Sequence, residues 1–448
     1  MINATIVLFG GTGDLASRKL IPAFIDLIEK GKIAKKSLII GIGRKNLDDE
    51  SYKKFLISKV DEKSKDKIEE LNIKFFRGDV SSPDGLQGLG KLMSFCEIEG
   101  CNRVYYLATS FKFFPGIIRK LKELGLDKQK KGFTRIVFEK PFGENLKSSE
   151  ELDNDIHRVF SENEVYRIDH YLAKETVQNL HVLSFMNPIL YSTLNNEFVD
   201  SIEIEVRESL AVEDRIEYYN EAGAIKDMFQ NHLLQILSLI LLNRPKSLDS
   251  KSIHAEKLKV LKDIEILGAE NHFFGQYKSY KEELENKDLN DKKTETFLKV
   301  VLNCNNKRWN GVKLILTTGK KLDKKFGEIK INFKESTIKH GYSGAKPNKI
   351  LIGIYPKQDV NIVMNTLDVN QDSRVKDVKF EFCHACEFGP NTKSEYSVLL
   401  NEVLLGKKDL FASDEEIKEC WKITEKLERM KEKIRFVYYE DGKNPEDF

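Results

Sequence analysis

The sequence predicts a chain of two domains: an α/β domain with a doubly wound parallel sheet, then a larger α+β domain with a mainly antiparallel sheet. Three observations predict this class. The 448 residues are too many for one compact core. The first third alternates short apolar runs with helical patterns, as βαβ units do. The remainder contains runs that alternate apolar with charged residues, the period of half-exposed strands.

The composition limits the classes of function. The 73 Lys and Arg residues nearly balance the 71 Asp and Glu residues, and a net charge of +2 argues against general nucleic-acid binding. The longest apolar run, residues 233–242, is too short to cross a membrane. The first residues, MINATIVLFGG, lack the basic region that opens a secretory signal. We therefore expect a cytoplasmic protein without membrane contact.

Six cysteines are spread along the chain, and two of them form a C-x-x-C pair at residues 383–386. A structural zinc site usually has a second Cys or His pair at a related spacing, and none is evident in the sequence. We therefore expect reduced thiols, as is usual in the cytosol, and no metal site.

The first element is a strand at residues 6–9, a continuous apolar run of the kind buried on both faces of a parallel sheet. Residues 11–16 then read G-x-G-x-x-A. Glycines allow a tight turn and close approach of the backbone to a pyrophosphate, and the small Ala16 permits close packing of helix on strand. Gly31 ends the helical pattern, and a second apolar run follows at 37–43. This context predicts the dinucleotide-binding loop of a Rossmann domain.

Arg44 and Lys45 stand at the end of the second predicted strand, where an NAD site usually has a carboxylate for the ribose hydroxyls. Arg44 can pair with a 2′-phosphate, so the sequence favours NADP. The alternative is that both residues are solvated surface cations. Asp48 and Asp49 lie nearby, which keeps NAD as a weaker alternative cofactor.

Three further apolar runs, at 73–80, 103–109 and 134–143, complete the predicted parallel sheet. Ligands of such sheets bind at the carboxyl ends of the strands. Lys140 follows Glu139 at such an end and is a candidate site residue. A plain surface lysine is the alternative.

The segment RIDHYLAKE, residues 167–175, gathers five ionisable side chains around Tyr171. It has too much charge for a buried strand and too specific a composition for a loose loop. We expect the first domain to span 1–173 and the second to span 174–448.

The second domain is predicted mostly from its strands. Helical patterns occupy 176–187 and 413–434, and the charge run at 277–295 predicts a solvated helix and loop. The strand-like runs are 198–212, 297–302, 312–318, 328–333 and 349–354.

His232 falls in the apolar stripe of a long helical pattern at 222–242. A histidine there is most often a packed core residue, and a functional role is the alternative. Asp227 precedes it by five residues, about 140° round an α-helix, so any carboxylate that orients His232 must come from elsewhere. Asp169 is a candidate.

Four segments occur in order: GGTGDLA at 10–16, EKPFG at 139–143, RIDHYLAKE at 167–175 and DMFQNHLLQ at 227–235. Together they resemble the glucose-6-phosphate dehydrogenase family. The resemblance continues through 212–228, 318–322 and 399–421, so it covers nearly the whole chain.

The resemblance implies oxidation of the C1 hydroxyl of glucose 6-phosphate, with hydride transfer to NADP. It implies that His232 is the catalytic base and that Asp169 orients it. The implied contacts with the 6-phosphate come from His170, Tyr171 and Lys174, assisted by Lys320, and those with the sugar from Lys140, Glu208 and Asp227. Lys325 is a further implied substrate-binding residue. The implied cofactor contacts come from Gly10, Gly11, Thr12, Gly13, Asp14, Leu15, Arg44 and Lys140.

Some residues depart from the family pattern. Ala173 stands where the family usually has Gly, Lys325 where many members have Arg, and 106–114 lacks the usual proline pair. The family also implies a homodimer or homotetramer formed through the second domain's sheet, and the first step of the pentose phosphate pathway. The rival hypotheses are a dehydrogenase of another aldose 6-phosphate and a non-catalytic NADP-binding regulator.

Overall fold

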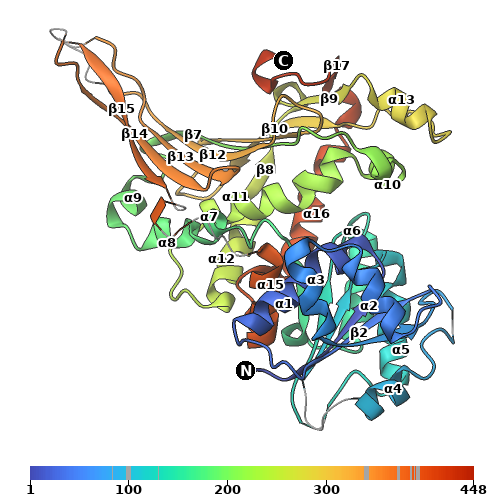
Figure 1. The fold of residues 1–448 in the computed structure, drawn as a ribbon. Coiled ribbons are helices and arrows are strands. Elements are labelled where there is room, and N and C mark those ends of the chain that lie inside the picture. Colours follow the sequence, from blue (N-terminus) through green and yellow to red (C-terminus); the bar gives the residue numbers. More distant parts are fainter. Residues whose placement is uncertain are drawn as a thin grey trace. The chain divides into compact units, whose positions relative to one another are not determined.

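The structure is a computed structural model that describes residues 1–82, 84–96, 102–129, 131–337, 343–370, 374–383, 386–387, 389 and 394–448 (Figure 1). The chain forms two compact units. The first comprises Met1–Ala173 and Lys393–Asp414, and the second comprises Lys174–Thr392 and Glu415–Phe448.

The first unit is built on a sheet whose described strands follow the order β16-β6-β5-β4-β1-β2-β3. All are parallel except β16. All six residues of β1 are buried, which explains its unbroken apolar run. From β3 to β6 the order is the 3-2-1-4-5-6 arrangement of a Rossmann sheet, so the predicted class is confirmed. The bounds are β1 Ala4–Phe9, β2 Leu38–Gly43, β3 Asn72–Arg77, β4 Asn102–Leu107, β5 Thr134–Phe138, β6 Val165–Ile168 and β16 Phe411–Ala412.

The helices of the first unit have polar starts and apolar buried faces. Asp48 caps α2 by accepting a hydrogen bond from Ser51 N at 2.8 Å, and Asn145 caps α6 in the same way from Ser148 N. The bounds are α1 Ile21–Glu29, which comes after the π-helical turn Ala16–Leu20, α2 Asp49–Ile57, α3 Glu62–Glu69, α4 Leu89–Cys96, α5 Phe114–Glu123, α6 Leu146–His157 and α15 Glu395–Leu405.

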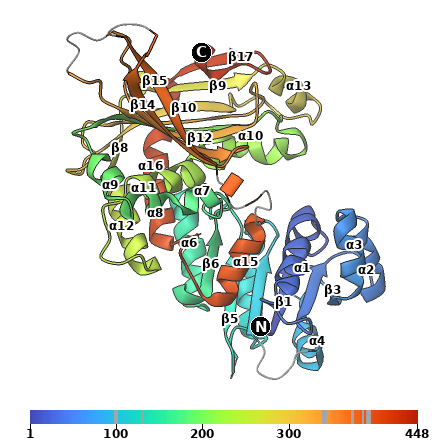
Figure 2. The same ribbon diagram turned by 60° about the vertical axis from the view of Figure 1, so that its left-hand side comes forward.

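The segment Lys393–Asp414 belongs to the first unit, although it comes after most of the second in the chain. Helix α15 packs against α1, and Leu399 and Val403 join the core cluster of that unit (Figure 2). Strand β16 pairs with β6, with Phe411 opposite Ile168. The predicted assignment of all of 174–448 to the second domain is wrong for this segment, because an amphipathic pattern predicts a helix without naming the core that it covers.

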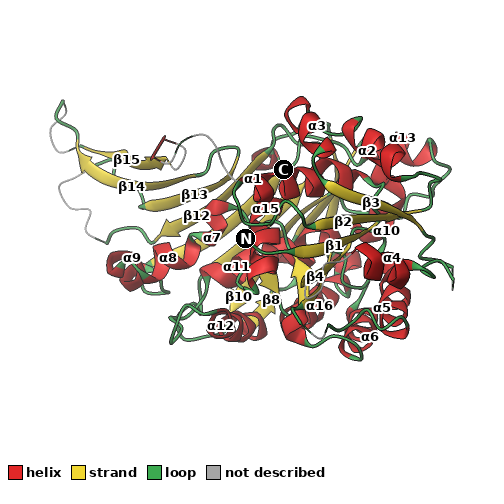
Figure 3. Cartoon of the chain, turned by 60° about the horizontal axis from the view of Figure 1, so that its bottom comes forward, coloured by secondary structure: helices red, strands yellow, loops and turns green. Residues whose placement is uncertain are grey.

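The second unit is built on a large, mostly antiparallel sheet, as predicted (Figure 3). Its described strands follow the order β15-β14-β13-β12-β7-β11-β10-β9-β17, and β8 pairs with β10. Strand β7 is parallel to β11, and β9 is parallel to β17. The bounds are β7 Val199–Arg207, β8 Ile264–Ile266, β9 Phe273–Tyr277, β10 Phe297–Cys304, β11 Lys313–Gly319, β12 Phe326–Phe333, β13 Lys349–Tyr355, β14 Asp359–Leu367, β15 Val375–Cys383 and β17 Arg435–Tyr439.

The long helix predicted at 222–242 is interrupted. Gly223 has a φ of +60°, a conformation that glycine adopts readily, and it separates α10 from the next helix. Ile225–Leu233 is a π-helix, labelled η5, which continues into α11. The other helices of this unit are α7 Glu175–Gln178, α8 Leu180–Phe185, α9 Pro188–Thr193, α10 Ile216–Ala224, α11 Leu234–Ile240, α12 Ser250–Asp263, α13 Tyr280–Glu285 and α16 Asp414–Glu428.

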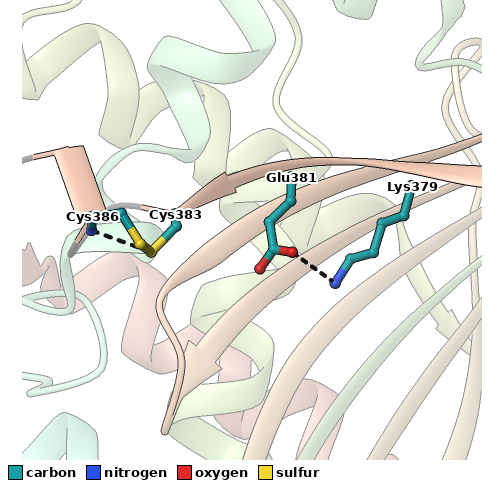
Figure 4. The surroundings of a disulfide bond; sticks show 4 residues. All are labelled: Lys379, Glu381, Cys383 and Cys386. Atoms are coloured by element: carbon teal, nitrogen blue, oxygen red, sulfur yellow. Dashed lines mark hydrogen bonds and ion pairs between the residues drawn. A yellow bond between two sulfur atoms is a disulfide. The ribbon is translucent and has the colours of Figure 1, made fainter.

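The cysteines differ from the predicted set of reduced thiols. Cys383, the last residue of β15, forms a disulfide with Cys386, so the prediction is wrong for this pair (Figure 4). The Cα atoms of the two cysteines lie 5.2 Å apart, within the usual range for a disulfide. Cys304 and Cys420 are buried thiols, as expected. Cys101 and the side chain of Cys96 lie outside the described residues.

In the described part of the chain, none of the helices combines the length and the apolar character that crossing a membrane requires.

Candidate active site

The predicted cofactor loop, Gly10–Leu15, follows β1 directly. Gly10 has a φ of +85°, and a Cβ there would lie 2.3 Å from the carbonyl oxygen of Ala108. A Cβ on Gly11 would lie 2.7 Å from Gly41 Cα, so the loop passes too close to β2 for a side chain. Gly13 and Asp14 are exposed, and Thr12 and Leu15 are half-buried. The loop therefore brings its backbone close to the carboxyl end of the sheet, the edge at which Rossmann domains bind a pyrophosphate.

Arg44 lies directly after β2 and is exposed. Asp48 caps α2, and Asp49 accepts hydrogen bonds from Lys74 Nζ and Phe75 N, both at 2.8 Å. These two carboxylates therefore have structural partners, whereas the guanidinium of Arg44 is accessible to a ligand. The neighbouring Lys45 instead lies over the ring of Phe55, 4.2 Å from its centre.

Glu139 and Lys140 follow β5 at the same edge of the sheet. Tyr106 Oη donates a hydrogen bond to Glu139 Oε1 at 2.5 Å. Burial raises the pKa of Glu139 to about 7, and the charge of Asp169 also raises it. The hydrogen bonds from Tyr106 and Tyr396 and the charge of Lys140 act in the opposite direction and lower this pKa. The edge therefore gathers a lysine and two carboxyl groups from neighbouring strands, β5 and β6.

The segment 167–173 begins inside a buried strand, contrary to the prediction made from its charge. Arg167 is the third residue of β6, and its guanidinium forms ion pairs with Asp153 and Glu162, each at 2.7 Å. Pairing offsets the cost of burying the charge. The chain then turns, because Asp169 Oδ1 accepts a hydrogen bond from Tyr171 N at 3.0 Å.

Asp169 and Tyr171 are buried, and His170 is half-buried with its ring 4.8 Å from that of Tyr171. The first unit thus places Lys140, Asp169, His170 and Tyr171 after two adjacent parallel strands, whose carboxyl ends lie at one edge of the sheet.

In the second unit, Lys174 and Lys325 meet at one aromatic ring. Their ammonium groups lie 5.3 and 5.6 Å from the centre of the Tyr355 ring. Each cation is attracted by the ring, but the two repel each other. Two cations beside one ring make this region positively charged, which favours an anion such as a phosphate.

Lys320 holds two predicted site residues together. Its Nζ atom lies 2.5 Å from Glu208 Oε2 and 3.7 Å from Asp227 Oδ2. Glu208 follows β7 and Lys320 follows β11, and these strands are parallel with Arg207 opposite Gly319, so their ends coincide. Lys320 and Asp227 are 7% and 2% exposed, so this is a pre-formed, largely buried polar site.

His232 and Asp227 both belong to η5 and are buried. A π-helix bonds residue i to residue i+5, which places the two residues one turn apart along one side. The predicted separation of about 140° assumed α-helical winding, which does not apply to this π-helical segment. Such π-helical turns occur frequently at functional sites.

Three residues of this region were not predicted. Arg215 Nη2 lies 3.4 Å from Asp227 Oδ1, and the rings of Tyr219 and Tyr355 lie beneath the lysines. Burial raises the pKa of Tyr219 well above its usual value, and the charges of Asp227, Glu295 and Glu208 raise it further. Arg215 and Tyr219 lie within the 212–228 stretch of the resemblance, but their spacing gave no reason to link them to Lys320.

A dinucleotide-type loop on a Rossmann sheet, joined to a unit that gathers carboxylates and lysines, defines a nicotinamide-dependent oxidoreductase. Residues 7–179 match the family model described as "Glucose-6-phosphate dehydrogenase, NAD binding domain". Residues 181–447 match the one described as "Glucose-6-phosphate dehydrogenase, C-terminal domain". The chain belongs to the glucose-6-phosphate dehydrogenase family.

Individual relatives agree with this assignment. The chain is 36% identical to a glucose-6-phosphate 1-dehydrogenase of Borreliella burgdorferi, over 94% of this chain and 90% of the relative. It is 32% identical to that of Bacillus subtilis, over 95% and 91%. Among solved structures, a glucose-6-phosphate dehydrogenase in complex with its substrate glucose-6-phosphate matches with a TM-score of 0.90 and 29% identity, over 99% of this chain and 96% of that chain.

Proposed function

We propose that the protein oxidises the C1 hydroxyl of D-glucose 6-phosphate to 6-phosphoglucono-δ-lactone and reduces NADP. The observation that carries this proposal is the buried site in which Lys320 joins Glu208 and Asp227. The hydroxyl groups of a sugar ring bind to hydrogen-bond acceptors and donors at fixed positions. This site offers two carboxylates as acceptors and one ammonium group as a donor. The same site would suit another aldose 6-phosphate, which is the second candidate.

The reaction removes a hydride from C1 and a proton from its hydroxyl. The nicotinamide, when bound, accepts the hydride. His232 is the proposed base, because a neutral imidazole takes up a proton near pH 7. Asp169 is proposed to orient the imidazole and to stabilise it once protonated, as the carboxylate of a catalytic triad does.

The 6-phosphate is assigned to Lys174 and Lys325, with His170, Tyr171 and Lys320. The two ammonium groups at the Tyr355 ring support this assignment, since a doubly charged anion matches two cations. Glu208 and Asp227 are proposed to accept hydrogen bonds from sugar hydroxyls. Lys140 is proposed to contact both sugar and cofactor.

The cofactor is proposed to be NADP, with NAD as a weaker alternative. The exposed Arg44 after β2 supports a contact with the 2′-phosphate. Asp48 and Asp49 accept hydrogen bonds from the protein's own backbone, so neither carboxylate is offered to the ribose hydroxyls. The glycine loop, Gly10–Leu15, is proposed to hold the pyrophosphate.

The protein is further proposed to be a cytoplasmic homodimer or homotetramer that catalyses the first step of the pentose phosphate pathway. Large apolar side chains are exposed on β14 and β15, among them Met364, Leu367, Phe380 and Phe382. Exposed apolar side chains on neighbouring strands are typical of a protein–protein interface.

The test is an assay of reduced nicotinamide formation, by absorbance, with glucose 6-phosphate, other hexose phosphates and free glucose, each with NADP or NAD. We expect the highest kcat/KM for glucose 6-phosphate with NADP. A higher value for another hexose 6-phosphate would select the second candidate, and no turnover with any of them would overturn both.

The same assay tests the proposed base. We expect His232→Asn to lower kcat about 10²–10⁴-fold, which is the usual cost of losing a general base, with little change in KM for glucose 6-phosphate. Asp169→Asn is expected to lower kcat by a smaller factor. Near-normal turnover of His232→Asn at neutral pH would make His232 a packed core residue.

A further inference from the structure

Glu295 lies just before β10 and is almost fully buried, with 1% of its surface exposed. Its main-chain carbonyl accepts a hydrogen bond from Ala224 N at 2.9 Å, and its Oε1 accepts one from Ile225 N at 3.1 Å. These N–H groups open helix η5, which carries Asp227 and His232. A helix start has unsatisfied N–H groups and a partial positive charge, so a carboxylate is favourable there.

Gly223, just before the helix start, has no side chain and so leaves space for this carboxylate. Gly223 has a φ of +60°, and a Cβ on it would lie 2.1 Å from Glu295 Oε1. The other carboxylate oxygen, Oε2, forms an ion pair with Lys431. Both oxygens therefore have a partner, and the buried charge is compensated.

The residues on either side of Glu295 hold two further elements of the same unit. Thr294 Oγ1 donates to the main-chain carbonyl of Asn220 in α10, at 2.9 Å. The carbonyl of Thr296 accepts from Lys320 N, also at 2.9 Å. One short segment thus fixes both the start of η5 and the backbone of Lys320.

We propose that Glu295 is a positioning residue for the dehydrogenase reaction: its carboxylate fixes the start of η5 and thereby sets the places of Asp227 and His232. This inference rests on the proposed function of those two residues. Glu295 acts through the helix and not on the substrate. Its loss lets η5 shift, which separates Asp227 from Lys320 and displaces the base.

The kinetic test compares Glu295→Ala with Glu295→Gln in the full chain. We expect Glu295→Ala to lower kcat at least ~10-fold and to raise KM for glucose 6-phosphate, with KM for NADP within about 2-fold of the parent. Glu295→Gln keeps an oxygen for Ile225 N and is expected to remain within about 3-fold of the parent. A purely structural role would lower only the folded fraction and leave both KM values unchanged, and that result would overturn the proposal.

A control variant and a second variant complete the kinetic test. Asp249→Ala removes the cap of α12, where Asp249 Oδ1 accepts a hydrogen bond from Ser252 N at 2.9 Å, and parent-like kcat and KM are expected. If Glu295→Ala does not fold, Glu295→Asp replaces it: the charge remains, but the shorter side chain no longer reaches Ile225. A loss of kcat is again expected, and parent-like kinetics would overturn the proposal.

Hydrogen exchange of the free protein separates this inference from the proposed function. We expect the amides of residues 224–233 to exchange at least ~10-fold faster in Glu295→Ala than in the parent, with little change in α12. Unchanged exchange would overturn the role of Glu295. If the parent oxidises no sugar phosphate, the proposed function fails, while the exchange result still decides whether Glu295 fixes the helix.

Discussion

At Tyr355 two lysine side chains approach one ring, and together they form a positively charged region that favours an anion. We expect Lys174→Ala to raise KM for glucose 6-phosphate about 10- to 150-fold, because one charge-assisted hydrogen bond contributes roughly 1.5–3 kcal/mol. The matched control is Lys324→Ala, since Lys324 lies over Phe326 instead, 4.9 Å from its ring centre. An equal rise in KM for free glucose would contradict a phosphate contact.

Arg44 is exposed directly after β2, whereas the ammonium group of its neighbour Lys45 lies over the ring of Phe55. We expect Arg44→Ala to raise KM for NADP by up to about 10- to 150-fold, less if solvent weakens the contact, and hardly to change that for NAD, because only NADP carries the 2′-phosphate. Lys45→Ala, which removes a cation from the ring of Phe55, is the control. Salt should weaken NADP binding more than NAD binding. An unchanged ratio of kcat/KM for the two cofactors would make Arg44 an ordinary surface cation.

At the scale of elements, a buried ion pair joins two helices of the second unit. Lys257 of α12 donates to Glu416 of α16 at 2.8 Å and to Gln235 of α11 at 2.6 Å. His254 Nδ1 also lies 2.7 Å from Glu416. Lys257 and Glu416 are almost fully buried, so each is tolerated only because the other compensates its charge.

Removing one member of this pair should therefore lower the free energy of unfolding substantially. We expect Lys257→Met to lower the free energy of unfolding by about 3–5 kcal/mol, because it leaves the carboxylate of Glu416 buried without its main partner. The double variant Lys257→Met with Glu416→Leu should recover much of the loss. Lys259→Met on the same helix removes an exposed pair with Glu256 and should cost less than about 1 kcal/mol. Urea unfolding at neutral pH measures all three.

The pair also predicts how stability depends on pH. Burial alone would raise the pKa of Glu416, but the charges of Lys257 and His254 outweigh it and lower the pKa to about 2, from 4.5 in the unfolded chain. The folded pKa is the lower one, so this stabilisation is complete above pH 4.5 and is lost as the pH falls towards 2. Between pH 5 and pH 3 the parent should lose stability more steeply than the double variant. Equal slopes would contradict the assignment.

Some elements of the fold can be predicted from the sequence and others cannot, for physical reasons. Strands β1 to β5 of the Rossmann sheet were predicted from their apolar runs, which in β1 reflect burial on both faces. Strand β6 was not predicted, because the charges of its segment suggested that it could not be a buried strand. Strands β14 and β15 were not predicted, since the buried residues of β14 are confined to its start and β15 has none, so neither strand shows an alternating buried face. The apolar stripe of 222–242 fits an α-helix and a π-helix equally, so it did not reveal η5.

The residues of the candidate site also differ in how well the sequence predicts them. The glycine loop and Arg44 can be predicted from local spacing, because one turn and one strand end position them. The meeting of Lys320 with Glu208 depends on the parallel pairing of β7 and β11, which are far apart in sequence. Glu295 ends a charged stretch that predicts solvent exposure, and only the fold shows that it is buried.

At the scale of the whole molecule, the exposed apolar side chains of β15 predict self-association. We expect the parent to be a dimer or tetramer in solution and Phe380→Glu to shift it to smaller species, because a new charge in an apolar interface is desolvated without a partner. Lys379→Glu, on the opposite face of the same strand, is the control (Figure 4). Light scattering after size exclusion gives the masses. A monomeric parent, or no change in Phe380→Glu, would remove this surface from the interface.

The late return of the chain to the first unit has a consequence for its synthesis. Strand β6 receives its edge partner β16, and α1 its neighbour α15, only after the ribosome has translated all of Lys174–Thr392. At about 5–20 residues per second, that delay is on the order of tens of seconds. During it the nascent N-terminal unit has an open sheet edge and an uncovered apolar face, which are features that chaperones bind. A message cut before the codons for α15 would leave the N-terminal unit incomplete, even though every residue of its cofactor loop had been made.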